Sequence, residues 1–271
     1  MLPGLVLALR EGLEGALIVG ILLGSLKRLD YAGRARPVWL GAVAATLVSV
    51  LVALALTALG AELEGASEAW FEGMTTLAAA AVLTWMIFWM QRQGRSVRRG
   101  LEVQVRRVVS GKAEHGLFAV SFIAVAREGI ELALFLTAAA MATSAAQTWI
   151  GAGIGLALAV AFGWAVFAST VRLDVRRFFQ VTGALLLIFA AGLVARSVHE
   201  FVEIGWLPAL IQNVWNTTST LNDRSALGQM AASLLGYRSS PSLAEVVSYT
   251  GYLATILLLL WRTGQTPSRT A

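Results

Sequence analysis

The chain contains no cysteine among its 271 residues. This absence excludes disulfide bonds and thiolate metal sites, and it leaves the redox compartment open. Charged residues are scarce at 14%, whereas 57% of the residues are hydrophobic and the mean hydropathy is +0.71. Apolar runs such as WLGAVAATLVSVLVALALTALG, over 39–60, are long enough to cross about 30 Å of hydrocarbon. The composition therefore predicts an integral membrane protein.

The beginning of the chain has no basic stretch, and charges interrupt its first apolar run, so we do not expect a cleavable signal peptide. The apolar runs instead predict an all-α, polytopic membrane protein with seven transmembrane helices. The expected spans lie at about 4–26, 38–60, 70–91, 116–141, 148–171, 178–199 and 243–262.

Basic residues alternate from one connection to the next. Lysine and arginine gather in the connections 27–37, 92–115 and 172–177, whereas 61–69 is acidic and 142–147 has no charge. Because basic connections stay on the cytoplasmic side, this alternation predicts an N-terminus outside and a C-terminus in the cytoplasm. The net charge of +5 and the pI near 10.2 then reflect topology, and no nucleic-acid partner is expected.

Two apolar segments carry the same charged motif, RExxE. The first is LALREGLEGALIVGILLGSL at 7–26, and the second is AVAREGIELALFLTAAA at 124–140. An ionised group at the centre of a membrane helix costs about 2.5–3.5 kcal/mol, so three in one helix cost roughly 8–10 kcal/mol before pairing. Intramembrane charge at that cost indicates a functional site.

Pairing within each motif recovers only part of this cost. Arg10 and Glu14 are i,i+4 neighbours, as are Arg127 and Glu131, so each pair can form along its helix. Two facing motifs would then hold four carboxylates and two guanidinium groups, which is stable only if the cluster is protonated or holds a cation. Hard oxygen ligands suit a hard or borderline metal ion. We therefore predict a metal site formed by Glu11, Glu14, Glu128 and Glu131, with Arg10 and Arg127 as supporting ion pairs.

The two motifs fall in the first and fourth spans, which run in opposite directions. This predicts a 3+3 inverted repeat, the arrangement in which many transporters bind their substrate near the midplane. The predicted single domain comprises a first repeat at about 4–91, an amphipathic cytoplasmic linker at 92–115, a second repeat at about 116–199, an outer loop at 200–242 and a last helix at 243–262. Buried ion pairs that only fix helix register are the structural alternative, and the duplication of the motif argues against it.

Paired RExxE segments in spans 1 and 4 resemble those of the iron permease family, with its fungal high-affinity ferric and bacterial EfeU-type members. The stretches FEGMTTLAAAAVLTWMIFWM (71–90), VTGALLLIFAAGL (181–193), HEFVEIGWLP (199–208) and LLGYRSSPS (234–242) are similar to that family as well. The resemblance implies a permease that imports Fe3+ or Fe2+ across the plasma membrane or bacterial inner membrane, with the four glutamates required for iron movement. It also implies a periplasmic iron-binding protein and an iron-oxidising peroxidase or ferroxidase as partners, with iron as substrate and no cofactor.

Weaker candidates lie near the outer ends of the third and sixth spans. Glu72 is a candidate mouth ligand, or else an interfacial glutamate with its head group in water. His199 and Glu203 form an i,i+4 pair, as do Arg196 and Glu200. We expect this group to be either an entry site for the ion or a capping network of the helix.

Two other functions are compatible with parts of the sequence. Carboxylates alone do not select iron, so a permease for another divalent metal fits the same residues. A membrane di-iron carboxylate enzyme needs Glu-x-x-His motifs, and the sequence contains none. Its two histidines, His115 and His199, fall at opposite membrane faces in the predicted topology. The sequence therefore favours a transporter over an enzyme.

Overall fold

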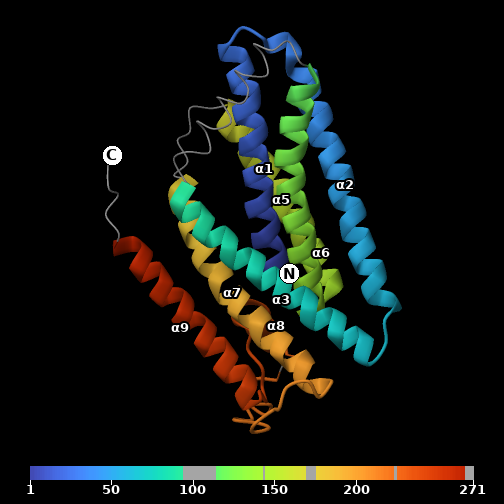
Figure 1. Cartoon of the computed structure of the whole chain (residues 1–271), viewed down its shortest axis with the longest axis vertical. Helices are drawn as coiled ribbons and strands as arrows, with labels where there is room; N and C mark the ends of the chain where they lie inside the picture. Colours follow the sequence, from blue (N-terminus) through green and yellow to red (C-terminus); the bar gives the residue numbers. More distant parts are fainter. Residues whose placement is uncertain (94–113, 143, 169–174, 223–224, 266–271) are drawn as a thin grey trace. The chain divides into compact units, whose positions relative to one another are not determined.

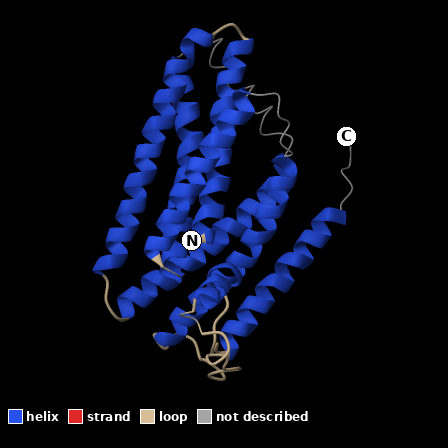
Figure 2. Cartoon of the chain, turned by 180° about the vertical axis from the view of Figure 1, so that it is seen from behind, coloured by secondary structure: helices blue, strands red, loops and turns tan. Residues whose placement is uncertain are grey.

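The computed structural model describes residues 1–93, 114–142, 144–168, 175–222 and 225–265, and the regular elements in these ranges are all helices (Figure 1, Figure 2). The predicted amphipathic linker falls largely in 94–113, outside the described residues. The seven long helices are α1 (Leu2–Arg28), α2 (Ala35–Glu62), α3 (Ala66–Gln93), α5 (Glu114–Ala142), α6 (Ala145–Ala168), α7 (Val175–Glu203) and α9 (Leu243–Gln265). Shorter elements are η1 (Ala32–Arg34) and α8 (Ala226–Leu235).

The seven long helices coincide with the seven predicted spans, each within a few residues at either end. Five helices, α2, α3, α6, α7 and α9, are long and apolar enough to cross a membrane. The motif helices α1 and α5 are as long, at 27 and 29 residues, but three charged residues interrupt each. On α2, Leu47, Leu51 and Leu54 are each more than 60% exposed, which suits a helix that faces lipid. The fold is that of a polytopic membrane protein, as predicted.

The chain divides into two compact units. Unit 1 comprises Met1–Glu62, Met90–Ala140 and Ser144–Thr182, and unit 2 comprises Leu63–Trp89, Met141–Thr143 and Gly183–Ala271. Unit 1 thus contains α1, α2, α5 and α6, which run alongside one another (Figure 1). Unit 2 contains most of α3 and most of α7, together with α8 and α9.

In unit 1, α1 packs along α6 through small residues on both helices. A side chain at Gly151 would meet the carbonyl oxygen of Met1, and one at Gly155 would meet that of Leu5. Within the first motif, a Cβ on Gly12 would lie 2.7 Å from the Cβ of Ala159. Small residues spaced four apart let membrane helices approach to backbone contact, so α1 and α6 form a closely packed pair.

The helices α2 and α5 pack in the same manner. A Cβ on Gly41 would lie 2.6 Å from the carbonyl oxygen of Phe118, and the Ser121 hydroxyl donates a 2.8 Å hydrogen bond to the carbonyl of Val38. In the second motif, Gly129 faces the side chain of Ser49, which fills the space that a Cβ would need. Both motif glycines therefore mark the point where a neighbouring helix crosses.

Leucine side chains fill the remaining space between these helices. Leu22 and Leu26 of α1 pack with Val38 of α2 and Leu117 of α5 in one buried cluster. A second cluster joins α1, α5 and α6 through Ala8, Leu136 and Ala152. These two clusters link α1 and α6 to α2 and α5 through side chains.

Unit 2 is held by apolar packing and by hydrogen bonds between its helices. Ile87, Leu187 and Ile256 form a buried cluster from α3, α7 and α9, and Thr84 and Tyr252 share a 2.6 Å hydrogen bond between their hydroxyls. Between α7 and α9 the chain contains α8, and its segments 211–217 and 239–243 are joined by backbone hydrogen bonds. At the end of α8, Gly236 adopts a left-handed φ of 67° and lies against Gly192 of α7, where a Cβ has no room.

Candidate metal-binding site

The first motif places one guanidinium between two carboxylates on α1. Arg10 Nη1 lies 2.6 Å from Glu11 Oε1, and Arg10 Nη2 lies 2.8 Å from Glu14 Oε1. The predicted Arg10–Glu14 pair is confirmed, and the contact with Glu11 adds to it. Arg10 is 1% exposed and Glu11 is 2% exposed, so this pair is enclosed by the protein, whereas the Glu14 side chain is 14% exposed.

The second motif is paired in the predicted way but is more open. Arg127 Nε donates a 2.9 Å hydrogen bond to Glu131 Oε1. The Arg127 side chain is 31% exposed, whereas Glu128 and Glu131 are buried. The two motifs therefore differ: in α1 the guanidinium is sealed in, and in α5 it reaches the protein surface.

Carboxylates from the two motifs converge in unit 1. One oxygen from each of Glu11, Glu128 and Glu131 lies within 4.8 Å of the others, and all three residues are buried. In each of the three, Oε2 has no hydrogen-bond partner in the part of the chain that the structure describes. A buried carboxylate oxygen without a partner is costly, so the arrangement is stable only if the carboxylates are protonated or hold a cation.

The charge balance supports the same conclusion. Four carboxylates and two guanidinium groups carry a net charge of −2 when all are ionised, in surroundings of low dielectric where such an excess is poorly screened. Glu14 contributes one of the four negative charges and pairs with Arg10. Its oxygens do not belong to the group of three mutually close carboxylate oxygens. The sequence predicted four equivalent glutamates, and the structure brings three of them together.

The donor set contains carboxylate oxygens only. Among the described residues, the group of three close metal-ligating side chains contains no histidine. His199 lies in unit 2, and α5 begins at Glu114, next to His115. Oxygen-only donors suit hard and borderline cations, and they lack the Glu-x-x-His ligands of a di-iron carboxylate enzyme.

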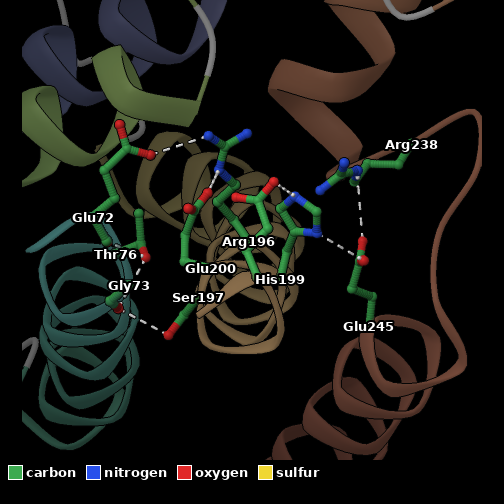
Figure 3. A network of polar contacts seen from close by, with 10 residues as sticks. Glu72, Gly73, Thr76, Arg196, Ser197, His199, Glu200, Arg238 and Glu245 are labelled. Carbon is green, nitrogen blue, oxygen red and sulfur yellow. Dashed lines mark hydrogen bonds and ion pairs between the residues drawn. The ribbon is translucent and has the colours of Figure 1, made fainter. Parts of the chain in front are cut away.

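The weaker candidates lie in a separate polar network of unit 2 (Figure 3). Arg196 on α7 donates a 3.1 Å hydrogen bond from Nη2 to Glu72 Oε2 on α3, and its Nε lies 2.7 Å from Glu200 Oε1. The Ser197 hydroxyl donates to the carbonyl of Gly73 at 2.8 Å. The structure therefore shows Glu72 as an ion-pair partner that joins α3 to α7.

His199 connects α7 to the beginning of α9. Its Nδ1 lies 3.1 Å from Glu245 Oε1, and its Nε2 lies 4.0 Å from Glu203 Oε1. Glu203 is exposed, whereas Glu245 is buried and also lies 3.6 Å from Arg238 Nε. The predicted i,i+4 pairs of α7 are confirmed.

Glu245 and Arg238 were missed by the sequence analysis. A signal for Glu245 was present, because Ser242 and Glu245 have the spacing of a capping box. Glu245 Oε1 accepts hydrogen bonds from the backbone N–H and the hydroxyl of Ser242 at 3.3 and 3.0 Å. No local pattern pointed to Arg238.

Comparison with known proteins identifies the family. The model of the iron permease FTR1 family matches residues 1–263. The chain is 33% identical to the ferrous iron permease EfeU of Yersinia pestis over 254 residues, which cover 93% of this chain and 90% of the relative. It is also 33% identical to the ferrous iron permease EfeU of Shigella sonnei (strain Ss046) over 268 residues, or 97% of each chain. No solved structure matches the chain. These proteins are transporters rather than enzymes, and this chain belongs to the iron permease FTR1 family.

Proposed function

We propose that the permease imports Fe2+ across the bacterial inner membrane, with Glu11, Glu128 and Glu131 as the ligands that the ion meets on its way. The observation that carries this proposal is the convergence of three buried carboxylates from two helices, each with one oxygen that lacks a hydrogen-bond partner among the described residues. Fe2+ is preferred over Fe3+ because both relatives are named as ferrous permeases.

Glu14 is the fourth glutamate of the proposed path. It contacts Arg10 Nη2, whereas Glu11 contacts Nη1, so its charge helps to keep Arg10 in place. In this proposal Glu14 is required for uptake because it positions Arg10 and adds negative charge. It need not touch the ion while the other three glutamates bind it.

The proposed mechanism uses an inverted repeat, in which α1–α3 correspond to α5–α7. Its support is the matching of contacts: α1 pairs with α6, α5 pairs with α2, and the motif glycines Gly12 and Gly129 face Ala159 and Ser49 respectively. The ligand carboxylates come from both pairs, since Glu11 is on α1 and Glu128 is on α5. A movement of one pair against the other would open or close the site, as in other inverted-repeat transporters.

Iron uptake by purified protein in liposomes tests the proposal. Radioactive Fe2+, kept reduced, should enter liposomes that contain the wild type, and Glu128→Gln should abolish entry because it removes one ligand charge while keeping the shape. Equal uptake by Glu128→Gln and the wild type would reject the site. The same liposomes test the second candidate, a general divalent-metal permease, by measuring Mn2+ and Zn2+ entry, since carboxylate oxygens alone do not select iron.

The resemblance to the iron permease family implies two partner proteins. A periplasmic iron-binding protein and an iron-oxidising peroxidase or ferroxidase would act at the outer face, which the arginine pattern assigns to the N-terminal side of α1. Uptake by liposomes without other proteins would show that the permease itself conducts the ion. It would leave to the partners only the supply of iron.

A further inference from the structure

In each motif, the arginine contacts one oxygen of a carboxylate that we propose as a ligand of the metal ion. Arg10 Nη1 lies 2.6 Å from Glu11 Oε1, and Arg127 Nε lies 2.9 Å from Glu131 Oε1. The other oxygen of each, Oε2, is buried without a hydrogen-bond partner in the described ranges. Glu11 and Glu131 therefore have one oxygen engaged by a guanidinium and one oxygen left for an ion.

We infer that Arg10 and Arg127 act as specificity-determining residues that limit Glu11 and Glu131 to one ligand oxygen each, so that the site accepts a small transition-metal ion and rejects Ca2+. This inference rests on the proposed function of the same carboxylates. Its physical basis is ligand number. Ca2+ takes six to eight oxygen ligands at about 2.3–2.6 Å and commonly uses a carboxylate through both oxygens.

The structure makes two-oxygen binding unfavourable at both positions. For Glu11 to offer Oε1 to an ion, its contact with Arg10 must break inside the protein, where Arg10 is 1% exposed and its guanidinium would lose a charged partner. Glu14 holds the same guanidinium at 2.8 Å, which opposes its withdrawal. A smaller ion of the first transition series needs fewer ligands and shorter bonds, so single oxygens from three glutamates, completed by water, are sufficient.

Arg127 is the better residue to change, because its side chain is 31% exposed and its loss disturbs the fold less. Arg127→Met removes the donor and frees Glu131 Oε1, whereas Arg127→Lys keeps a cationic donor for that oxygen and serves as the matched control. Both variants and the wild type are assayed for Fe2+ uptake into liposomes against rising Ca2+. The Ca2+ concentration that halves uptake should fall by about tenfold in Arg127→Met, since Ca2+ gains a ligand oxygen, and should stay near the wild-type value in Arg127→Lys. Equal Ca2+ sensitivity in all three proteins would overturn the inference.

Infrared difference spectroscopy gives a second measurement that does not need an active arginine variant. Mn2+ is added to purified wild type, Glu11→Gln and Glu131→Gln as an air-stable stand-in for Fe2+. The gap between the antisymmetric and symmetric carboxylate stretches widens for one-oxygen binding and narrows for two-oxygen binding. Each Gln variant should lose a wide-gap pair of bands, and loss of a narrow-gap pair would overturn the inference. If Mn2+ changes no carboxylate band in the wild type, the proposed site itself is rejected together with the inference.

Discussion

Ser49 on α2 occupies the space that a side chain at Gly129 would need, at the centre of the second motif on α5. Both residues lie in unit 1 and Ser49 is buried. The Ser49 hydroxyl is directed back to its own helix, where it donates a 2.9 Å hydrogen bond to the carbonyl of Ala45. The position of Glu128 and Glu131 therefore depends on a close helix crossing that tolerates no Cβ.

Gly129→Ala should push α5 away from α2 and displace the adjacent glutamates. Overpacking of this kind typically costs about 1–3 kcal/mol, so we expect a lower unfolding temperature and strongly reduced iron uptake. Ser49→Gly alone should be mild, and the double variant Ser49→Gly, Gly129→Ala should regain much of the lost uptake because the added methyl then has room. If the double variant is no better than Gly129→Ala, the crossing does not set the glutamate positions.

Arg10→Ala should destabilise the protein far more than Arg127→Ala does. Removing one partner of a buried ion pair costs about 3–5 kcal/mol, and Arg10 holds both Glu11 and Glu14 while almost fully buried. The Arg127 side chain is about one-third exposed, so its ion pair with Glu131 is less completely buried. Membrane yield and thermal unfolding in detergent measure the difference. Equal losses for the two variants would contradict the buried position of Arg10 between Glu11 and Glu14.

The four motif glutamates should separate into two classes. Glu11→Gln, Glu128→Gln and Glu131→Gln should each abolish uptake and weaken Mn2+ binding to the purified protein. Glu14→Gln should also lower uptake, but it should retain more of the Mn2+ affinity because Glu14 lies outside the group of mutually close oxygens. Equal losses of affinity in all four variants would restore Glu14 as an equivalent ligand.

Cross-linking tests whether the pair α1–α6 moves against the pair α2–α5. The wild type has no cysteine, so only the introduced cysteines can react. A reducible cross-linker between Ala16→Cys and Gly163→Cys joins α1 to α6, where a Cβ on Gly163 would lie 3.0 Å from that of Ala16. We expect uptake to survive this link. A link between Ala8→Cys and Leu136→Cys, from the cluster that joins α1 to α5, should stop uptake until it is reduced. Uptake that continues across the α1–α5 link would exclude movement between the pairs.

Glu245→Gln should loosen the beginning of α9. Its carboxylate contacts His199 and Arg238 and accepts hydrogen bonds from Ser242, and hydrogen bonds to charged groups contribute about 1.5–3 kcal/mol each. The exposed Glu203→Gln is the matched control and should change stability by less than about 1 kcal/mol. Thermal unfolding measures both. Similar stability of the two variants would show that the network does not hold α9.

The positions of the helices and the pairs within a helix followed from sequence, because both depend on local spacing. The runs of apolar residues placed all seven long helices, and the i,i+4 rule gave Arg10–Glu14, Arg127–Glu131 and Arg196–Glu200. The Arg10–Glu11 contact was missed because adjacent residues on a helix do not face each other. Only the long guanidinium side chain, enclosed at 1% exposure, closes that distance.

Contacts between distant segments were not predictable in the same way. The duplicated motif suggested that α1 and α5 meet, but nothing local showed that Glu14 would lie outside the group of close oxygens. That outcome depends on how α1 is rotated, which is set by the packing of Gly12 against Ala159 on α6. Likewise, the Glu72–Arg196 pair joins residues separated by 124 positions, and no spacing rule covers such a distance.

The pairing of α1 with α6 also bears on how the protein is made. More than half of the chain is synthesised before α6 begins at Ala145, so α1 enters the membrane with three charged residues and without the helix that it packs against. A ribosome-bound chain that ends before α5 and α6 should leave α1 poorly inserted and open to membrane proteases, whereas release after α6 should protect it. The helix α1, which carries the first motif, would then be synthesised first but would reach its final packing only after α6 has entered the membrane.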